Sequence, residues 1–270
     1  MPTIPFKPTR IAPPLRPRFP QLLRMRRNIN LLTPDQLSRL RAAWKASYEL
    51  DDNRGYAHHA GLHGLPLPTE CSHDNVLWLP WHRAYLYFFE QSLRDIDPRM
   101  TLPWWSWASG SLPAAYTTTA DGNPLHHAAI PPDARVPNGP SQTERDGPAP
   151  GSLPTQSQIK TVMERNDFLD FSAGLRQLHN QVHGVIGGSM GIVANAAYDP
   201  IFWAHHAYVD RAWRLWQLNH PATGLPASVL NQALAPFPMT VQQTLSVTAL
   251  GYDYARSTIS LPFASRGGTS

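Results

Sequence analysis

The stretch GLHGLPLPTECSHDNVLWLPWHRAYLYFFE (61–90) determines the fold, because it combines clustered histidines with the apolar pattern of a buried helix. It contains His63, His73 and His82. Cys71, the single cysteine of the chain, lies two residues before His73. Neutral imidazole is the commonest protein ligand of transition metals and suits copper, zinc, iron and nickel. The stretch therefore predicts a metal site at the start of a helix.

A second group of histidines lies downstream, in LHNQVHGVIGGSM (178–190) and DPIFWAHHAYVDRAW (199–213). His179 and His183 are four residues apart on a predicted helix, so both rings project from one face. His206 lies on the next predicted helix among aromatic residues, and facing helices of a bundle can assemble a metal site. The two clusters have no carboxylate at matching spacing. They indicate two metals held by imidazole alone and not a di-iron carboxylate site.

The composition is that of a compact protein with a large core. Of the 270 residues, 42% are apolar, with nine each of Trp, Tyr and Phe, so a sizeable domain can be buried. Only 16% are charged, and the 28 prolines are about twice the usual share of ~5%. We therefore expect one domain over residues 1–270, with long connections stiffened by proline.

The charge distribution and the absence of targeting signals bear on binding partners and on cellular location. The net charge is +4 and the pI about 9.4, but no nucleic-acid motif accompanies the basic residues, which gather near the start. Residues 1–25 are therefore predicted to be an extended basic arm in solvent, with no nucleic-acid partner. One cysteine excludes an internal disulfide. No apolar run of about 18 residues occurs, so neither a signal peptide nor a membrane helix is expected. The protein is expected in the cytoplasm, or secreted after processing or with a partner protein.

Hydrophobic periodicity predicts a mainly α-helical fold with a few short strands. Thr33 as N-cap and Pro34 at the first helical position open the first helix. Residues 102–113 are aromatic but broken by proline, and residues 110–154 form a long Pro/Gly-rich loop. The predicted helices span about Thr33–Leu50, Trp78–Ile96, Thr155–Phe168, Phe171–Ile186 and Ile201–Leu218, and β-like alternation occurs at 240–247 and 257–261.

These motifs together resemble the type 3 copper family, which contains tyrosinases, catechol oxidases and molluscan hemocyanins. The resemblance covers roughly half of the chain and includes six histidines in order with their flanking residues. The segments that carry it are HGLP (63–66), CSH (71–73), LPWHRAYLYFFE (79–90), LHNxVH (178–183) and DPIFWxHHAxVDRxW (199–213), with RRNINLLTPDQL (26–37) and LGYDY (250–254) at the two ends.

The resemblance implies a tyrosinase-like central domain, in which a four-helix bundle holds a dicopper centre. The implied chemistry is O2 binding as a side-on peroxide between two copper ions, followed by oxidation of phenols and o-diphenols to o-quinones. His205 matches a spacer position and is expected to be structural. The implied ligands are His63, His73 and His82 for the first ion and His179, His183 and His206 for the second. The histidines that match no motif, which are expected to be solvated or packed, are His58, His59, His126 and His127.

Finer roles also follow from the resemblance. Cys71 is expected to form a thioether with the ring of His73. Val193 is expected to lie over the second copper and shape the substrate entrance. Asn180, directly after a ligand, pairs in members active on monophenols with a Glu nine residues before that ligand, and the two hold a water that acts as a base. Here that position is Asp170, one methylene shorter, so weaker monophenolase than diphenolase activity is expected.

One further residue is expected to support the metal ligands. A ligand histidine needs its second ring N–H fixed by a carbonyl or a carboxylate, and Asp210 is a candidate for that role.

The leading function is a tyrosinase-like polyphenol oxidase acting on O2 and small phenols. Alternatives are a catechol oxidase or o-aminophenol oxidase without significant monophenolase activity, and hemocyanin-like O2 binding. A dizinc hydrolase would need Asp or Glu ligands. Only 16 residues follow Tyr254, so no C-terminal covering domain is expected.

Overall fold

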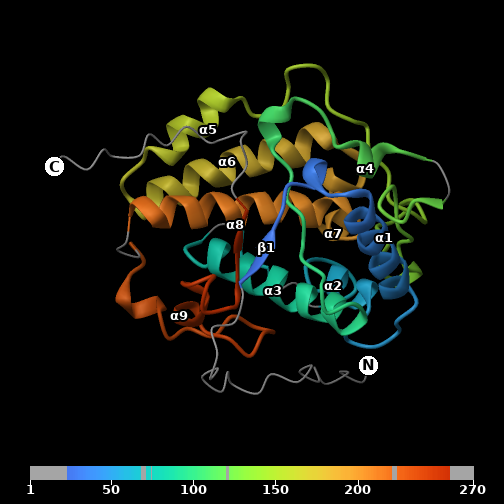
Figure 1. Ribbon diagram of the computed structural model, residues 1–270, viewed down its shortest axis with the longest axis horizontal. Coiled ribbons are helices and arrows are strands. Elements are labelled where there is room, and N and C mark those ends of the chain that lie inside the picture. Colours follow the sequence, from blue (N-terminus) through green and yellow to red (C-terminus); the bar gives the residue numbers. More distant parts are fainter. Residues whose placement is uncertain (1–22, 68–70, 74, 120–121, 221–223, 256–270) are drawn as a thin grey trace.

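The computed structural model describes residues 23–67, 71–73, 75–119, 122–220 and 224–255 (Figure 1). Three helices of 19 residues cross the middle of the molecule, and α1 (Pro34–Tyr48) packs against the first of them. These long helices are α3 (Trp78–Ile96), α6 (Phe168–Ile186) and α8 (Ile201–Asn219). The predicted mainly α-helical fold, with a helix bundle around the histidines, is confirmed.

The remaining elements are short. β1 and β2 pair in parallel with Arg26 opposite Tyr254, so the two ends of the described chain lie side by side. No described helix combines the length and the apolar character needed to cross a bilayer. The short elements are β1 (Arg24–Arg26), η1 (Ile29–Leu31), α2 (Tyr56–Gly61), η2 (Trp107–Ser109), α4 (Ala114–Thr117), η4 (Pro132–Ala134), α5 (Gln156–Met163), η5 (Gly188–Gly191), α7 (Val193–Ala196), η6 (Ala227–Val229), α9 (Val241–Thr244) and β2 (Tyr252–Tyr254).

Local capping explains where the long helices begin. The Thr33 hydroxyl accepts a hydrogen bond from the Gln36 backbone N–H, and Gln36 Oε1 accepts one from the Thr33 backbone N–H, so α1 starts as predicted. α6 starts three residues earlier than predicted, because Asp167 caps it by accepting from the Asp170 backbone N–H. In α8 the Ile201 N–H donates to the Asp199 carboxylate. Side chains shortly before α1, α6 and α8 thus bind the first backbone N–H groups of these helices, whereas α3 has no such cap.

Some sequence expectations need correction. TVQQTLSV (240–247) is not a strand: Thr240 and Gln243 form a capping box, so residues 241–244 make a helical turn, α9. The helix predicted to end at Phe168 ends at Met163. The helix α2 lies in a region that the sequence left loose. The other β-like run, 257–261, and most of the basic arm lie outside the described residues.

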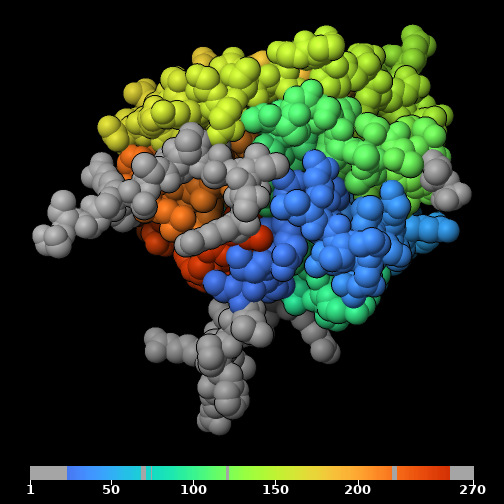
Figure 2. Space-filling view, turned by 45° about the horizontal axis from the view of Figure 1, so that its top comes forward, coloured from blue at the N-terminus to red at the C-terminus, as the bar shows by residue number. Residues whose placement is uncertain are grey.

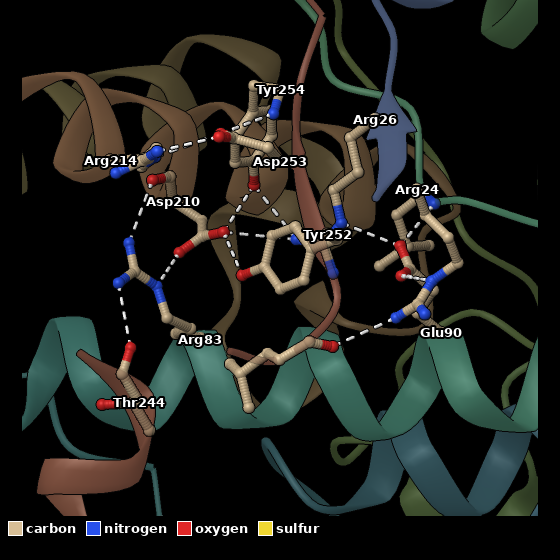
Figure 3. A network of polar contacts seen from close by, with 12 residues as sticks. Arg24, Arg26, Arg83, Glu90, Asp210, Arg214, Thr244, Tyr252, Asp253 and Tyr254 are labelled. Atoms are coloured by element: carbon tan, nitrogen blue, oxygen red, sulfur yellow. Dashed lines mark hydrogen bonds and ion pairs between the residues drawn. The ribbon is translucent and has the colours of Figure 1, made fainter. Parts of the chain in front are cut away.

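A buried polar network joins the bundle to the strands (Figure 3). Asp210 on α8 accepts hydrogen bonds from Arg83 on α3 and from the Tyr252 hydroxyl. Glu90 on α3 accepts from Arg26 Nε on β1 at 2.8 Å. Burial acts to raise the pKa of Asp210, but the guanidinium groups of Arg83 and Arg26 outweigh it and hold that pKa below its usual value. Buried charges persist only when paired, so this network fixes α3 and α8 relative to each other.

Candidate metal centre

The first histidine cluster is built largely on loops. His63 follows the end of α2, His73 lies in an irregular segment, and only His82 lies within a helix, α3. The ligand atoms of these three residues and of Cys71 all lie within 4.8 Å of one another. His63 and His82 are buried, whereas His73 is half-buried. The structure therefore brings together the three histidines that were expected to bind the first copper.

A close approach of two backbones positions the His63 loop. His63 Nδ1 donates to the Val193 carbonyl at 3.2 Å. The next residue is Gly64, where an added Cβ would lie 2.3 Å from the Ala194 carbonyl oxygen. Only glycine therefore allows this loop to lie against α7, and through that contact His63 depends on a segment 130 residues later.

The second cluster is built on helices. His179 and His183 project from one face of α6, and His206 comes from α8. Their ligand atoms, with one from His205, lie within 4.8 Å of one another. Each ring uses Nδ1 as a donor to an oxygen of the protein. The pairs are His179 with Asn180 Oδ1 at 2.8 Å, His183 with Met190 O at 2.7 Å and His206 with Phe202 O at 3.0 Å.

These hydrogen bonds leave three lone pairs pointing at one another. A carbonyl oxygen can only accept, so Nδ1 carries the proton and Nε2 carries the lone pair. His179 Nε2 lies 3.0 Å from His206 Nε2 and 3.1 Å from His183 Nε2. Burial lowers the pKa of all three, that of His183 to about 4, so protons do not bridge these atoms at neutral pH. Two nitrogens bound to one metal at ~2.0 Å are roughly 3.3 Å apart. Three Nε2 lone pairs at these distances therefore fit a bound metal cation.

The two clusters face each other and form one site. The rings of His82 and His206 stack with centroids 4.8 Å apart and an interplanar angle of 12°. The rings of His73 and His179 lie 6.3 Å apart across the same gap. No Asp or Glu belongs to either group among the described residues. Two sites of three neutral imidazoles each suit a pair of copper ions.

The neighbouring histidines on α8 have different roles. Trp107 Nε1 donates to His205 Nδ1 at 3.1 Å, so that nitrogen holds a lone pair and the proton lies on Nε2. His205 could bind a metal through Nε2 only by losing this proton, whereas His206 presents a free lone pair. His205 is fully buried. Trp107, which the sequence did not single out, therefore makes His205 a packing residue as expected.

Cys71 lies directly against the ring of its expected partner. Its Sγ is 3.4 Å from His73 Nδ1 and 3.5 Å from His73 Nε2, and 3.5 Å from His82 Nε2. The sulfur is therefore in contact with the His73 ring and almost equally far from its two nitrogens. Burial raises the pKa of the Cys71 thiol well above its usual value, so it is a poor thiolate ligand.

Two expected roles are not supported by the geometry. Asp210 gives its oxygens to Arg26, Arg83 and two tyrosines, and the cluster rings are fixed by carbonyl and amide oxygens instead. Asp170 is exposed in the first turn of α6, while Asn180 lies ten residues later in the same continuous helix. At ~1.5 Å per residue they are about 15 Å apart along the axis and cannot share a water. Nor does Asp170 cap α6, because Asp167 does.

One edge of the site reaches the surface. Asn180 is exposed, Val193 is 56% exposed, and His73 and His183 are only half-buried. Arg176, one helical turn before His179, donates to the His73 carbonyl at 2.8 Å and so ties the two clusters together. The sequence analysis missed this residue, although its spacing from His179 puts it on the ligand face.

The other histidines lie apart from the two clusters. His59 is buried and its Nε2 lies 2.8 Å from the Ser92 hydroxyl, and burial lowers its pKa to about 3. His58 is half-buried beside it. His126 and His127 contact each other on the surface. The described residues thus place none of these histidines in a metal cluster.

Comparisons with known proteins agree with this geometry. Residues 53–219 match the family model described as the common central domain of tyrosinase. The chain is 31% identical over 241 residues to a tyrosinase of Streptomyces glaucescens, covering 76% of this chain and 86% of that protein. It is also 31% identical over 224 residues to hemocyanin units G and H of Sepia officinalis, covering 77% of this chain but 40% of that protein.

Solved structures show the same fold. A functional unit of Octopus hemocyanin superposes with a TM-score of 0.74 at 28% identity, covering 88% of this chain and 69% of that one. A tyrosinase of Burkholderia thailandensis superposes with a TM-score of 0.72 at 21% identity, covering 88% of this chain and 74% of that one. The chain therefore corresponds to most of a bacterial relative but to less than half of a molluscan one.

Proposed function

This chain belongs to the family of the tyrosinase central domain, and on that premise we propose that it oxidises phenols and o-diphenols to o-quinones with O2, using two copper ions. The observation that carries the proposal is the open edge of the site. Val193 accepts a hydrogen bond from His63 through its carbonyl, while the residue is 56% exposed. A residue that touches the metal ligands therefore also lines the surface, where a phenol ring can approach.

The chain supplies the ligands and the surroundings, and bound copper would supply the reduction of O2 and the oxidation of the phenol. His63, His73 and His82 would hold one ion and the other three ligands the second. Hydrogen bonds at Nδ1 fix the ring orientations. Phe202 stacks on His206 with centroids 3.8 Å apart, and Trp78 lies 5.3 Å from His179. These rings exclude water from the inner side of the site.

Monophenols should react more weakly than diphenols. A phenol with a pKa near ~10 must lose its proton before it binds copper, and a nearby base lowers that cost. Asn180 stands at the rim, but its Oδ1 accepts from His179. Asp170 is too distant to assist it. No carboxylate of the described residues joins the clusters, so the chain offers little help with this proton.

We also propose that Cys71 and His73 are joined by a thioether. The S–H bond of Cys71 and one C–H bond of the His73 ring are replaced by an S–C bond, and the two protons and two electrons released would pass to O2, the oxidant of the proposed reaction, which is reduced to hydrogen peroxide. The position of Sγ against the ring supports this bond. The bond would restrain His73, whose own segment has no regular secondary structure.

A competing function is reversible O2 binding without turnover, because the relatives include hemocyanins. The test is to load the protein with copper, add O2, and assay a monophenol and a diphenol. Turnover of the diphenol supports the oxidase. O2-dependent absorption without turnover of either substrate supports the carrier.

Two variants make this test specific. Since free copper oxidises catechols slowly, His206→Gln treated in the same way gives the background rate. Val193→Phe should raise KM about tenfold while leaving the O2-dependent absorption intact, since it narrows the open edge. Unchanged kinetics in Val193→Phe would place the substrate approach elsewhere.

A further inference from the structure

A cavity lies far from the histidine clusters. It has a volume of about 300 Å³ and lies between β1, α1 and the segment that follows α3. In Figure 2 the blue surface of residues 23–50 adjoins the green surface of residues that follow α3. His82 and the end of α3 at Ile96 are 14 residues apart. At ~1.5 Å per residue, the cavity is therefore about 20 Å from the metal ligands.

Four arginines line this cavity, and none of the described residues that line it is Asp or Glu. They are Arg24, Arg27, Arg39 and Arg99. Arg39 and Arg99 are paired with carboxylates outside the lining: Arg39 with Asp35 at 2.9 Å, and Arg99 with Asp97 through both Nε and Nη2 at 2.9 Å.

The other two arginines are less well compensated. Arg27 is exposed and makes no side-chain hydrogen bond or ion pair with a described residue. Arg24 Nε is buried without a hydrogen-bond partner, and the nearest carboxylate oxygen, Glu90 Oε1, is 3.7 Å away. The other oxygen of that carboxylate, Oε2, accepts from Arg26 Nε and from the Leu102 N–H, each at 2.8 Å, so one Glu90 carboxylate serves both Arg24 and Arg26. The four arginines therefore share three nearby carboxylates, one of which Arg26 also uses, and the lining keeps an excess of positive charge centred on Arg27.

The floor of the cavity is apolar. Leu40 and Met100 are 2% and 5% exposed, and Leu32 packs beside them. A guanidinium fork pairs with both oxygens of a carboxylate, and an apolar floor accommodates a hydrocarbon body. We propose that this cavity is a binding site for a carboxylate that carries a short apolar chain, with the carboxylate held by the arginines. The site is separate from the metal centre and does not depend on its activity.

The test uses octanoate with the copper-loaded protein and calorimetric titration. Octanoate is expected to bind, with an affinity that falls as salt shortens the screening length from ~10 Å at 0.1 M to ~3 Å at 1 M. Octanol lacks the charge and inorganic phosphate lacks the chain, so both are expected to bind at least about tenfold more weakly. Phosphate binding as tightly as octanoate would overturn the proposed ligand class.

Charge reversal locates the site. Arg27→Glu should weaken octanoate binding about fivefold or more. Arg99→Glu is a second variant, in case the first lowers thermal stability. Lys45→Glu is the matched control, because Lys45 is exposed on α1 and does not line the cavity. Carboxylate binding at the copper ions would be unaffected by all three. Octanoate affinity that is unchanged in both cavity variants, or lost equally in the control, overturns the proposal.

Discussion

The two histidine clusters reach similar geometries by different routes. The second takes its ligands from α6 and α8, where helical spacing alone points His179 and His183 in one direction. The first takes two of its three ligands from loops. There the positions depend on distant contacts, the Val193 carbonyl for His63 and the Arg176 side chain for His73. A cluster on helices is positioned by the fold, whereas a cluster on loops needs additional tethers.

The difference explains why His73 is held by other side chains, one of them from outside its own segment. Its carbonyl accepts from Arg176, and its ring lies against the Cys71 sulfur. Both contacts restrain a segment of the chain without a helix or a strand. Ordering such a segment costs about 1–2 kcal/mol per residue in backbone entropy, and a covalent bond would remove part of that cost before metal binds. The helix-borne ligands need no such device.

The largest effect is expected from a ligand of the helix-borne cluster. His206→Ala should leave one copper per chain and abolish the O2-dependent near-ultraviolet absorption, because two ions must act together. Metal content and absorption after anaerobic loading and oxygenation measure this. His59→Gln is the control, since His59 is a buried histidine outside both clusters and its variant should keep both ions. Two copper ions retained in His206→Ala would contradict the ligand assignment.

The next effect should separate the two clusters. Cys71→Ser removes the tether of the loop-borne cluster, so one of the two ions should be lost to a chelator about 10- to 100-fold more readily. The intact parent chain should weigh about two hydrogens less than its sequence and show no reactive thiol after unfolding. If both ions are lost at the same rate, the clusters are not independently stabilised. A freely alkylated Cys71 in active parent protein would exclude the thioether.

The sequence predicted the helix-borne cluster more completely than the loop-borne one. Helical spacing placed His179, His183 and His206 in a bundle, and the structure agrees. The Val193 carbonyl and Arg176 were not predicted as tethers, because no local pattern encodes a contact between residues that are 103 or 130 apart. The role expected for Asp170 does not fit the helix geometry for a related reason. Its position nine residues before a ligand gives no distance in space until the start of the helix is known.

Acid should destabilise the metal-free protein through its buried histidines. Burial lowers the pKa of His183 to about 4, below the usual 6.5, so the unfolded chain binds more protons between these values. The free energy of unfolding is therefore highest above pH 6.5 and falls as the pH drops toward 4. For one such group the loss between pH 6.5 and 5 is on the order of 1–2 kcal/mol. Urea unfolding at pH 7 and 5 measures it, and His183→Gln should reduce the pH dependence. An equal dependence in that variant would assign it to other groups.

The smallest effect is expected at Asp170. It tests whether the sequence spacing of Asp170 or its distance from Asn180 in α6 decides its role. Asp170 is exposed at the start of α6, about 15 Å along the helix from Asn180 at ~1.5 Å per residue. Asp170→Asn should therefore change the turnover of a monophenol and of a catechol by less than about twofold each. Asn180→Ala is the matched comparison, because Asn180 lies at the rim and bonds to His179. It should change the ratio of the two rates, since the amide that orients the ligand ring is lost. If Asp170→Asn selectively lowers monophenol turnover, the start of α6 must unwind in the working enzyme to bring the carboxylate to the rim. In that case the start of α6, like the loops of the first cluster, would be positioned by contacts with other parts of the chain and not by the helix alone.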